Sequence, residues 1–342
     1  MEEQKLPKVS VNILGYNEKD LLLEAIGTAL KQDYPNFEVT YIDNNSADGS
    51  EAFVRENFPQ INVLQTGENR HYGPGHNFGL RNTQSDLVWF LNSDLKISEN
   101  YLSECVKALM QDEKIAGVSG KMLRPEKNAD GKYFFDGCGL TINRTRVIRD
   151  RGQWEVDNGQ YDTPEEVFAL CGAGPVYRRA ALESIAIDDQ IMDEDIKAYF
   201  DDSDMGWRMR HQGWKIWYQP TAVLYHERGA GQSKNGYKDL RGFLKFRKTI
   251  GLGTKQLSWK NHIYIILKND FGKPLRRDWF RILIREIAML GFIVVFETST
   301  LKILPTVFKQ LPNILRKRKI IKSRSVLGDN NIDKFIVNSV KL

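Results

Sequence analysis

Strand-like and helix-like segments alternate through the first third of this chain of 342 residues. Each short, largely apolar run of strand length is followed by a stretch whose apolar residues recur at helical spacing. The expected strands are residues 9–14, 37–42, 61–65 and 87–91, and the expected helices are residues 20–31, 51–57, 77–83 and 99–111. This alternation predicts an α/β fold in three layers, with a mostly parallel sheet and right-handed crossovers.

Polar residues follow the predicted strands at the points where the strands end. Gly15 follows the first strand, Asp43 the second, and the run 87–91 leads into an Asn-Ser-Asp sequence that ends at Asp94. The carboxyl ends of parallel strands share one edge of the sheet, where open α/β folds bind their ligands. Hard divalent cations, which commonly carry phosphates, prefer oxygen ligands such as carboxylates. The pattern therefore predicts a site for a metal–nucleotide complex, with Asp94 as its anchor.

Each of these residues also has a purely structural interpretation. Asp43 lies among turn-forming residues, so an Asx turn or a helix N-cap explains it as well as recognition of a nucleobase does. Asp94 could cap the next helix, and a lone histidine such as His226 is more often structural than a metal ligand. The glycine-rich residues 73–77 could bring the backbone close to a phosphate or a sugar, although the chain has no GxGxxG or Walker motif there.

Three carboxylates stand within four residues at Asp201, Asp202 and Asp204, at the start of an expected helix that runs to residue 212. Acids at a helix N-terminus complement the helix dipole, which contributes roughly 0.3–1 kcal/mol each. Adjacent acids also repel one another, and four more acids lie between residues 189 and 195. This concentration of charge is easier to explain if a carboxylate serves a cation, or removes a proton from a hydroxyl that attacks an electrophilic carbon.

Charge divides the chain into two regions, residues 1–235 and 236–342. The first carries 26 Lys and Arg against 37 Asp and Glu, and the second carries 23 against 7. Such a division predicts two regions with different partners, and the acidic body argues against nucleic acid as a substrate. Three cysteines without a CxxC pair fit a reducing compartment, and the charged residues 1–8 do not resemble a secretory signal. We therefore expect a cytoplasmic protein.

The region 236–342 is expected to be mainly helical, basic and amphipathic. Its longest apolar stretch, residues 287–296, falls short of the roughly 18–20 residues that span a bilayer. Arg277, Arg281 and Arg285 repeat at helical spacing as a cationic ridge on an otherwise apolar helix, which is typical of a helix in a membrane interface. A polybasic cluster follows over residues 316–324. These features predict peripheral attachment to the anionic inner face of the cell membrane.

The polar segments occur in an order and at a spacing that resemble the inverting glycosyltransferases of family 2, which have the GT-A fold. The resemblance covers about residues 8–232, and each motif would be weak alone. The matching segments are residues 9–18, YIDNNSADGS (41–50), NRHYGPGHNFG (69–79), WFLNSD (89–94), GAGPVYRRAAL (172–182), FDDSDMGWR (200–208) and residues 213–226. The NSD sequence and the second half are most similar to the rhamnosyltransferase-like branch, which builds cell-surface polysaccharides. The resemblance implies a Rossmann-like GT-A domain over residues 1–235.

The resemblance also implies roles for individual residues of the matching motifs. The residues implied to bind the nucleotide-sugar are Leu14, Tyr16, Glu18, Asp43, Gly75, Asn77, Asn92 and Ser93, with Asp43 pairing with a ring N–H of the base. Asp94 and His226 would bind the Mn²⁺ or Mg²⁺ that bridges the diphosphate. Asp202 would be the catalytic base, and the acceptor side would consist of Gly172, Ala173, Asp201, Trp207 and Arg208. The chain departs from the family pattern at His71, which replaces a glycine, and at Asn92, which leaves the metal motif one carboxylate short.

The implied reaction is a single displacement with inversion at the anomeric carbon. The donor would be a dTDP- or UDP-linked sugar, with rhamnose as one candidate, because thymine and uracil present the same N3–H to Asp43. The acceptor would be a hydroxyl of a membrane-proximal glycan or of a lipid-linked acceptor in cell-surface polysaccharide synthesis. A sugar nucleotidyltransferase is one alternative, but residues 14–20 lack its glycine-rich signature. A non-catalytic membrane-bound adaptor is another, which would leave the acids at 201–204 unexplained.

Overall fold

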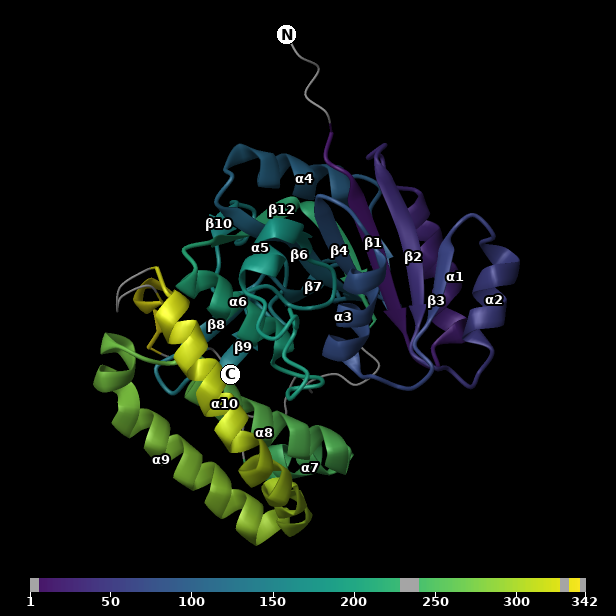
Figure 1. Cartoon of the computed structure of the whole chain (residues 1–342). Helices are drawn as coiled ribbons and strands as arrows, with labels where there is room; N and C mark the ends of the chain where they lie inside the picture. Colours follow the sequence, from purple (N-terminus) through teal and green to yellow (C-terminus); the bar gives the residue numbers. More distant parts are fainter. Residues whose placement is uncertain (1–5, 228–239, 327–331, 339–342) are drawn as a thin grey trace.

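The computed structural model describes residues 6–227, 240–326 and 332–338 (Figure 1). Within these residues the strands are β1 (Val9–Gly15), β2 (Phe37–Asp43), β3 (Asn62–Gln65), β4 (Leu87–Asn92), β5 (Leu95–Ile97), β6 (Ile115–Lys127), β7 (Tyr133–Gly137), β8 (Leu140–Asn143), β9 (Ile148–Asp150), β10 (Glu165–Glu166), β11 (Val176–Arg178), β12 (Lys215–His226) and β13 (Ile336–Val337). The α-helices are α1 (Lys19–Leu30), α2 (Ser50–Asn57), α3 (Tyr72–Asn82), α4 (Tyr101–Gln111), α5 (Arg179–Ser184), α6 (Asp201–His211), α7 (Leu240–Thr249), α8 (Leu252–Asn269), α9 (Lys273–Phe296) and α10 (Leu304–Arg324). Two 3₁₀ helices complete the set, η1 (Thr298–Ile303) and η2 (Asp333–Phe335).

The large sheet is mixed, and its parallel part has the strands that the sequence predicts. The strand order is β10-β12-β6-β11-β4-β1-β2-β3, with β5 beside β12 and β7 beside β6. Strand β1 pairs in parallel with β2 and β4, and β2 pairs in parallel with β3. Strand β11 lies antiparallel between β4 and β6. The predicted α/β fold with a parallel core is confirmed, and antiparallel pairing of β11, and of β5, β7 and β10, makes the complete sheet mixed.

Helices cover both faces of the large sheet, which gives the three predicted layers (Figure 1). One hydrophobic core joins a face of the sheet to the first helices of the chain, with Leu22 of α1 and Tyr101 of α4 among its buried residues. The other core contains Leu80 of α3, Leu182 of α5 and Met205 of α6. The helix that begins with the acidic segment therefore packs on the same face as the glycine-rich helix α3.

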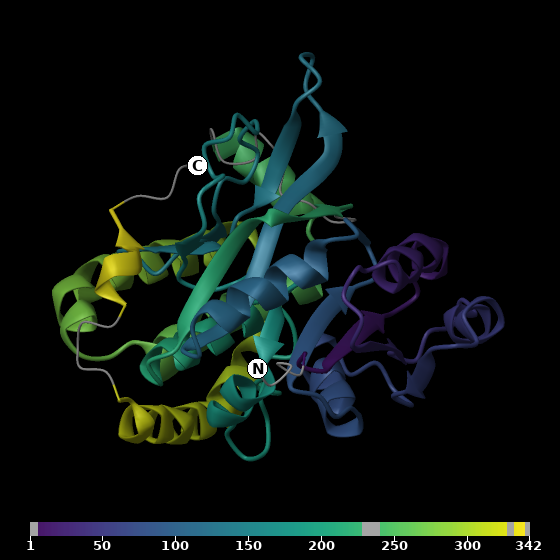
Figure 2. The same ribbon diagram turned by 90° about the horizontal axis from the view of Figure 1, so that it is seen from above.

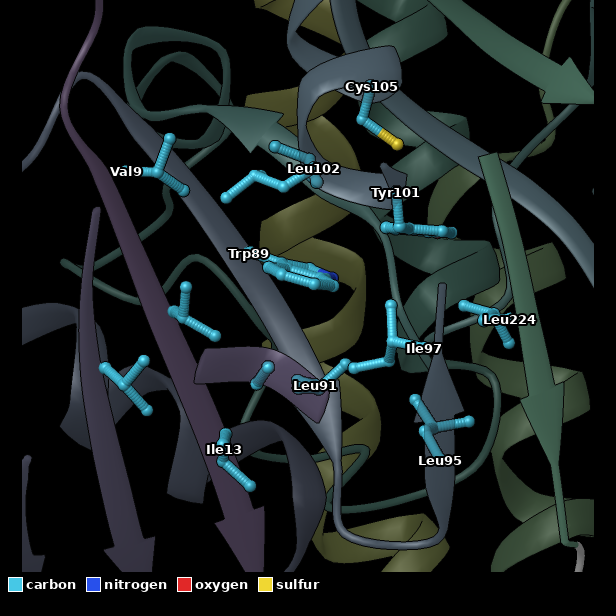
Figure 3. Packing of buried hydrophobic residues seen from close by; sticks show 14 of the residues in the cluster. Val9, Ile13, Trp89, Leu91, Leu95, Ile97, Tyr101, Leu102, Cys105 and Leu224 are labelled. Atoms are coloured by element: carbon cyan, nitrogen blue, oxygen red, sulfur yellow. The ribbon is translucent and has the colours of Figure 1, made fainter. Parts of the chain in front are cut away.

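Trp89 of β4 lies in the middle of the first core (Figure 3). Its ring stacks on Tyr101 with 5.3 Å between the centroids and 14° between the planes. Trp89 Nε1 and the Tyr101 hydroxyl both donate to the carbonyl of Gly174, at 3.0 and 2.7 Å. Strand β4 is thereby fixed to the segment that precedes β11, directly below the polar residues that follow β4.

Helix α3 begins at Tyr72, whereas the sequence predicted a loop up to about residue 77. Its glycines allow close packing: a Cβ on Gly75 would lie 2.9 Å from Leu14 Cδ1, and a Cβ on Gly79 would lie 2.3 Å from Ile42 Cδ1. Real side chains do not approach this closely, so glycine lets α3 lie against β1 and β2. The interpretation of these glycines as a loop was wrong because their helical packing depends on neighbours that are distant in the sequence.

The basic C-terminal helices lie against an acidic segment of the N-terminal region, on the side of the molecule away from α2 and β3 (Figures 1 and 2). Lys317 of α10 is buried, with Nζ 2.5 Å from Asp193 Oδ1 and 2.8 Å from Asp195 Oδ2. Lys268 of α8 pairs with Asp193 and lies 2.8 Å from Asp204. Acidic residues of the region 1–235 are therefore partly neutralised by basic residues of the region 236–342. Asp193 and Asp195 therefore bind lysines of the C-terminal helices. The prediction that the acids between residues 189 and 195 help to bind a cation or to transfer a proton is wrong for these two residues.

The cationic ridge predicted on α9 is paired with acids of the same chain. Arg277 lies 2.7 Å from Asp278 and 3.0 Å from Asp333, and Arg281 lies 3.6 Å from the same Asp278. Arg285 pairs with the glutamate that follows it, at 2.5 Å. These arginines are engaged in ion pairs within the protein. They therefore do not support the prediction that the ridge binds an anionic membrane surface.

Large apolar side chains are nevertheless exposed along most of α9 and at points of α10. They are Trp279, Phe280, Leu283, Ile284, Ile287, Leu290, Val294, Val295, Phe296, Phe308 and Leu315, and we call them the apolar face. Ile287 is 60% exposed and Val295 is 68% exposed. In the part of the chain that the structure describes, no helix by itself is long and apolar enough to cross a bilayer; α9 and the helical segment 298–324, which meet at 113°, meet that criterion only as a bent pair.

Candidate active site

Residues predicted to bind the donor gather at the carboxyl edge of the parallel strands. The register aligns Leu14 of β1 with Asn92 of β4. The hydroxyl of Ser93 donates to the carboxylate of Glu18, which comes from the turn after β1. Burial raises the pKa of Glu18; the hydrogen bond from Ser93 opposes this rise and the charge of Asp94 adds to it. The turns after β1 and β4 are thus joined into one polar rim.

Asp43 is buried at the end of β2, and its carboxylate accepts three hydrogen bonds. The Tyr41 hydroxyl donates to Oδ1 at 3.3 Å, and the Ser46 N–H and Gln65 Nε2 donate to Oδ2 at 3.0 and 2.7 Å. The Ser46 bond stabilises the turn that the structural interpretation predicted. Gln65 is the exposed donor of the three, so a nucleobase N–H could reach Asp43 by replacing its amide. Tyr16 is 44% exposed near this edge, where an aromatic ring can cover a base.

Asn77 of α3 is buried and tied to the loop that leads to α6. Its Nδ2 donates to the carbonyl of Met192 at 2.8 Å and to Glu194 Oε1 at 3.1 Å, and its Oδ1 accepts from the Met192 N–H at 3.0 Å. Both amide hydrogens are engaged. The predicted contact between Asn77 and a donor would therefore require one of these bonds to break, and the side chain serves in this structure to hold α3 and the loop together.

The structure brings Asp94 and His226 together, as the predicted metal site requires. Strand β5 pairs antiparallel with β12 in a register that places Leu95 opposite His226. His226 Nε2 consequently lies 3.2 Å from Asp94 Oδ2, and its Nδ1 lies 2.8 Å from Asp136 Oδ2 of β7. Burial lowers the pKa of His226, but hydrogen bonds to Asp136 and Asp94 outweigh this and raise it to about 9.

The residues around Asp94 fit a divalent cation. Asp94 Oδ1 is buried and has no hydrogen-bond partner in the described part of the chain, so an anionic oxygen is left for a cation. Asp136 can hold the proton of His226 on Nδ1, so a metal at Nε2 would displace the proton that this nitrogen shares with Asp94. Across residues 6–227, 240–326 and 332–338, no three His, Cys, Asp or Glu side chains cluster as a complete metal site. The chain would therefore supply two ligands, and diphosphate oxygens or water would supply the rest.

Asp202 is partly exposed at the start of α6, and its carboxylate is held by the backbone. Oδ1 accepts from the Ser203 N–H at 2.6 Å, and Oδ2 accepts from the Gly172 N–H at 3.2 Å. Burial raises the pKa of Asp202 to about 6; the hydrogen bond from Ser203 lowers it and the charge of Asp150 raises it. A carboxylate with a pKa near 6 is ionised at neutral pH and accepts a proton more readily than an ordinary aspartate does.

The other two acids of the segment have different surroundings. Asp204 is buried against Arg208 at 2.9 Å and Lys268 at 2.8 Å; burial raises its pKa, but these two cations outweigh burial and hold it below the usual value. Asp201 is buried as well, and burial together with the charge of Asp202 raises its pKa well above the usual value. Of the three acids, Asp202 is the one with access to solvent, so the structure separates roles that the sequence could not.

Gly172 and Ala173 connect the surroundings of Asp202 to the end of β4. The Gly172 N–H donates to Asp202, and the Ala173 carbonyl accepts from the Asn92 N–H at 3.1 Å. The Tyr72 hydroxyl of α3 donates to the Gly172 carbonyl at 2.5 Å. A Cβ on Gly172 would lie 2.7 Å from the Tyr72 hydroxyl, so a side chain at this position would displace Tyr72. This dipeptide therefore connects the residues predicted on the acceptor side with the residues predicted to bind the donor.

Trp207 and Arg208 are buried beneath the site. Trp207 packs edge-to-face on Phe168 at 5.7 Å. Arg208 Nη1 donates to the carbonyl of Ile185 at 2.6 Å, and Nη2 donates to the carbonyl of Ile191 at 2.5 Å. Neither side chain is available for direct contact with an acceptor, so any support that they give is through the position of α6.

Three residues that contribute to this site were not predicted from the sequence. Asp136 follows two phenylalanines in a hairpin, and Asp150 ends β9. Asn261 lies in the basic helical region, and its amide donates to three carbonyls of the turn before α6. None of them follows a strand of the parallel core or belongs to a recognisable motif, so the sequence held no signal for their selection.

Comparison with solved structures shows the fold. The mannosyltransferase PcManGT from Pyrobaculum calidifontis, solved in complex with GDP-Man and Mn²⁺, superposes with a TM-score of 0.53 at 18% identity, over 96% of this chain and 88% of that one. GalNAc-T7, solved with UDP, GalNAc and Mn²⁺, superposes with a TM-score of 0.56 at 11% identity, over 78% of this chain and 48% of that one. The fold is that of a GT-A glycosyltransferase. The sequence profile described as Glycosyl transferase family 2 matches residues 10–185, and the chain belongs to this family.

Curated relatives agree with this assignment. The O-antigen biosynthesis protein RfbC of Myxococcus xanthus is 23% identical over 251 residues, which are 70% of this chain and 19% of the relative. The GalNAc(5)-diNAcBac-PP-undecaprenol beta-1,3-glucosyltransferase of Campylobacter jejuni is 30% identical over 141 residues, which are 40% of this chain and 44% of the relative. The chain thus spans less than half the length of these relatives. These relatives are an O-antigen biosynthesis protein and a glucosyltransferase, which is consistent with the family that the sequence profile shows.

Proposed function

We propose that this glycosyltransferase moves a sugar from a nucleoside-diphosphate sugar to a hydroxyl group with inversion at the anomeric carbon. The observation that carries the proposal is Asp202, a partly exposed residue whose two carboxylate oxygens are held by the Ser203 and Gly172 N–H groups and whose pKa burial raises to about 6. Such a group can act as a general base at neutral pH.

In the proposed step, Asp202 takes the proton of the acceptor hydroxyl while that oxygen forms a bond to the anomeric carbon. The bond between the anomeric carbon and the diphosphate oxygen breaks, and its electron pair leaves with the nucleoside diphosphate. Gly172 and Ser203 hold the carboxylate so that one oxygen orientation is retained through the step. Burial and the charge of Asp202 raise the pKa of Asp201 well above the usual value, which disfavours a second negative charge beside the base.

Asp94 and His226 would hold a divalent cation, Mn²⁺ or Mg²⁺, with Asp136 orienting the histidine. When bound, such a cation stabilises negative charge on the diphosphate. Asp43 would accept from the ring N–H of uracil or thymine in place of Gln65, with Leu14, Tyr16, Glu18, Gly75, Asn92 and Ser93 around the rest of the donor. We propose a UDP- or dTDP-linked donor, and rhamnose as a candidate sugar on the strength of the resemblance to that branch.

The proposed acceptor is a membrane-proximal glycan or a lipid-linked acceptor in cell-surface polysaccharide synthesis. Support comes from the apolar face of α9 and α10, because large apolar side chains exposed on this scale are typical of a membrane or protein interface. The proposed location is the cytoplasmic face of the cell membrane, with residues 236–342 as the attachment region. This location would place the site next to lipid-linked substrates.

A panel of nucleotide sugars, each tested for release of nucleoside diphosphate with Mn²⁺ and with Mg²⁺, tests the proposal. Asp202→Asn should abolish transfer while donor binding persists, because the amide cannot accept a proton. The product anomer, read by NMR, should be inverted relative to the donor. Retention of configuration, or turnover by Asp202→Asn close to that of the native enzyme, would contradict the proposed mechanism.

A further inference from the structure

The turn before Asp202 has an unusual backbone. Lys197, Tyr199 and Phe200 have φ angles of 68°, 66° and 68°, in the left-handed region that favours glycine. This conformation is strained for an L-residue that has a side chain, so three such residues in four positions need compensation from outside the turn. Phe200 is also the N-cap residue of α6, and its carbonyl accepts the first helical hydrogen bond, from the Asp204 N–H at 2.9 Å.

Asn261 of α8 supplies this compensation from the C-terminal region. Its Nδ2 donates to the carbonyls of Ile196 at 2.9 Å, Ala198 at 2.8 Å and Tyr199 at 3.0 Å. The side chain is fully buried. An amide group has two hydrogens, so the three carbonyls converge on a single donor group, and the left-handed residues are what turn these carbonyls inward. The shape of the turn is thus built around Asn261.

The same turn also contacts the donor side of the site. The Lys197 carbonyl accepts from the Gly73 N–H of α3 at 2.9 Å. Residues 196–200 therefore lie between α8, α3 and the start of α6. A displacement of this turn would move the first residues of α6, where Asp202 is held by Gly172 at 3.2 Å.

We propose that Asn261 is a positioning residue for glycosyl transfer, which holds the turn 196–200 and thereby directs Asp202 toward the acceptor. The proposal rests on the role of Asp202 in the proposed function. It makes the C-terminal helical region part of the active site, in addition to any part that the region has in attachment to a membrane. Misplacement of a reacting group by about 1 Å can cost on the order of 100-fold in rate.

The test compares Asn261→Ala and the nearly isosteric Asn261→Asp with the control Asn313→Ala in the full chain. Asn313 of α10 donates to Asp195 Oδ2 at 2.7 Å, in the same interface but without contact to the turn carbonyls. Both Asn261 variants should lower kcat about 10- to 100-fold and change the donor KM by much less, because the turn holds the start of α6 directly but reaches α3 through the backbone hydrogen bond from Gly73 to Lys197. The control should keep kcat within about twofold. Each kcat is expressed per site that binds nucleoside diphosphate, so that unfolded protein does not count as lost rate.

The pH profile separates positioning from loss of structure. The titratable groups whose charge bears on Asp202 are Asp150 of β9 and Asp201, the first residue of α6, and Tyr72 and Tyr177 face it from α3 and β11. A loosened turn exposes Asp202 to water, which lowers its pKa, so the acidic limb of kcat should move to lower pH in both variants. If both variants have the native kcat and the acidic limb of their pH profiles lies at the native pH, the proposal is overturned.

The outcome for Asp202→Asn distinguishes the two proposals. If that variant is inactive and the Asn261 variants have native kcat, the positioning role is wrong and the proposed function stands. If Asp202→Asn remains active, the proposed function itself fails. A drop in kcat of the same size for Asn313→Ala would show that the whole interface matters, and would also overturn the specific role of Asn261.

Discussion

The Nε2 atom of His226 lies 3.2 Å from Oδ2 of Asp94, although 132 residues separate them in the chain. The pairing of β5 with β12 produces this contact, and Asp136 fixes the far side of the imidazole at 2.8 Å. Asp94 and His226, which were predicted from the sequence as metal ligands, thus form one site with Asp136, which was not predicted.

Asp136 should matter for metal affinity even though it would not touch the metal. Asp136→Asn should weaken Mn²⁺ binding by about 10- to 100-fold, because the histidine loses the carboxylate that orients it. Mn²⁺ binding is measured directly by electron paramagnetic resonance in the absence of donor, with Asp94→Ala as the variant that should bind Mn²⁺ least. If Asp136→Asn binds Mn²⁺ with native affinity, Asp136 has no role in metal binding.

The rate of transfer should fall in acid because of Asp202. Its pKa is raised to about 6, so the carboxylate is ionised above that pH and protonated below it. A protonated base cannot accept the acceptor proton, and kcat should therefore drop about tenfold per pH unit below about pH 6. Measurement of kcat from pH 4.5 to pH 8 at saturating donor checks this, with the folded fraction followed by circular dichroism. A flat profile over this range in folded enzyme would argue against Asp202 as the base.

Lys317 should contribute strongly to stability, and its neighbour Arg316 should not. Lys317 is buried between Asp193 and Asp195, so Lys317→Met leaves buried carboxylates with fewer partners and should lower the free energy of unfolding by about 3 kcal/mol. Arg316 pairs with Asp188 at the surface, where water screens the pair, and Arg316→Ala should unfold close to the native midpoint. Urea unfolding followed by fluorescence compares the two. Equal midpoints would mean that the buried cluster is not what holds the C-terminal helices.

The apolar face should bind anionic vesicles. Ile287→Asp and Val295→Asp each place a charge on a strongly exposed apolar position of α9, and each should reduce binding about tenfold or more, because burial of such a side chain is worth roughly 1.5–3 kcal/mol. Leu23→Asp is the matched control, since Leu23 is 61% exposed on α1, far from the apolar face along the chain. Cosedimentation with phosphatidylglycerol vesicles gives the affinities. If the control loses as much binding as the α9 variants, or if native protein does not bind, the attachment proposal fails.

The parallel core could be predicted from the sequence because its signals are local. The run Leu87–Asn92 and its neighbours have the apolar composition of buried strands, and the helices between them show a helical period over a few turns. Helix α3 is the exception, since the packing of Gly75 and Gly79 against Leu14 and Ile42 is not visible in a local pattern. Its early start was missed for that reason.

The sequence by itself determined the α/β core, the edge of the sheet at which polar residues collect and the three acids before Met205, because periodicity, strand ends and motif order are properties of neighbouring residues. Only the tertiary structure decided which acid is exposed. Asp204 is neutralised by Arg208 and by Lys268 from a distant helix, Asp201 is buried, and Asp202 alone of the three keeps access to solvent while the turn before it is held by Asn261. Burial and pairing depend on residues that come together when the chain folds, so no local pattern could assign them.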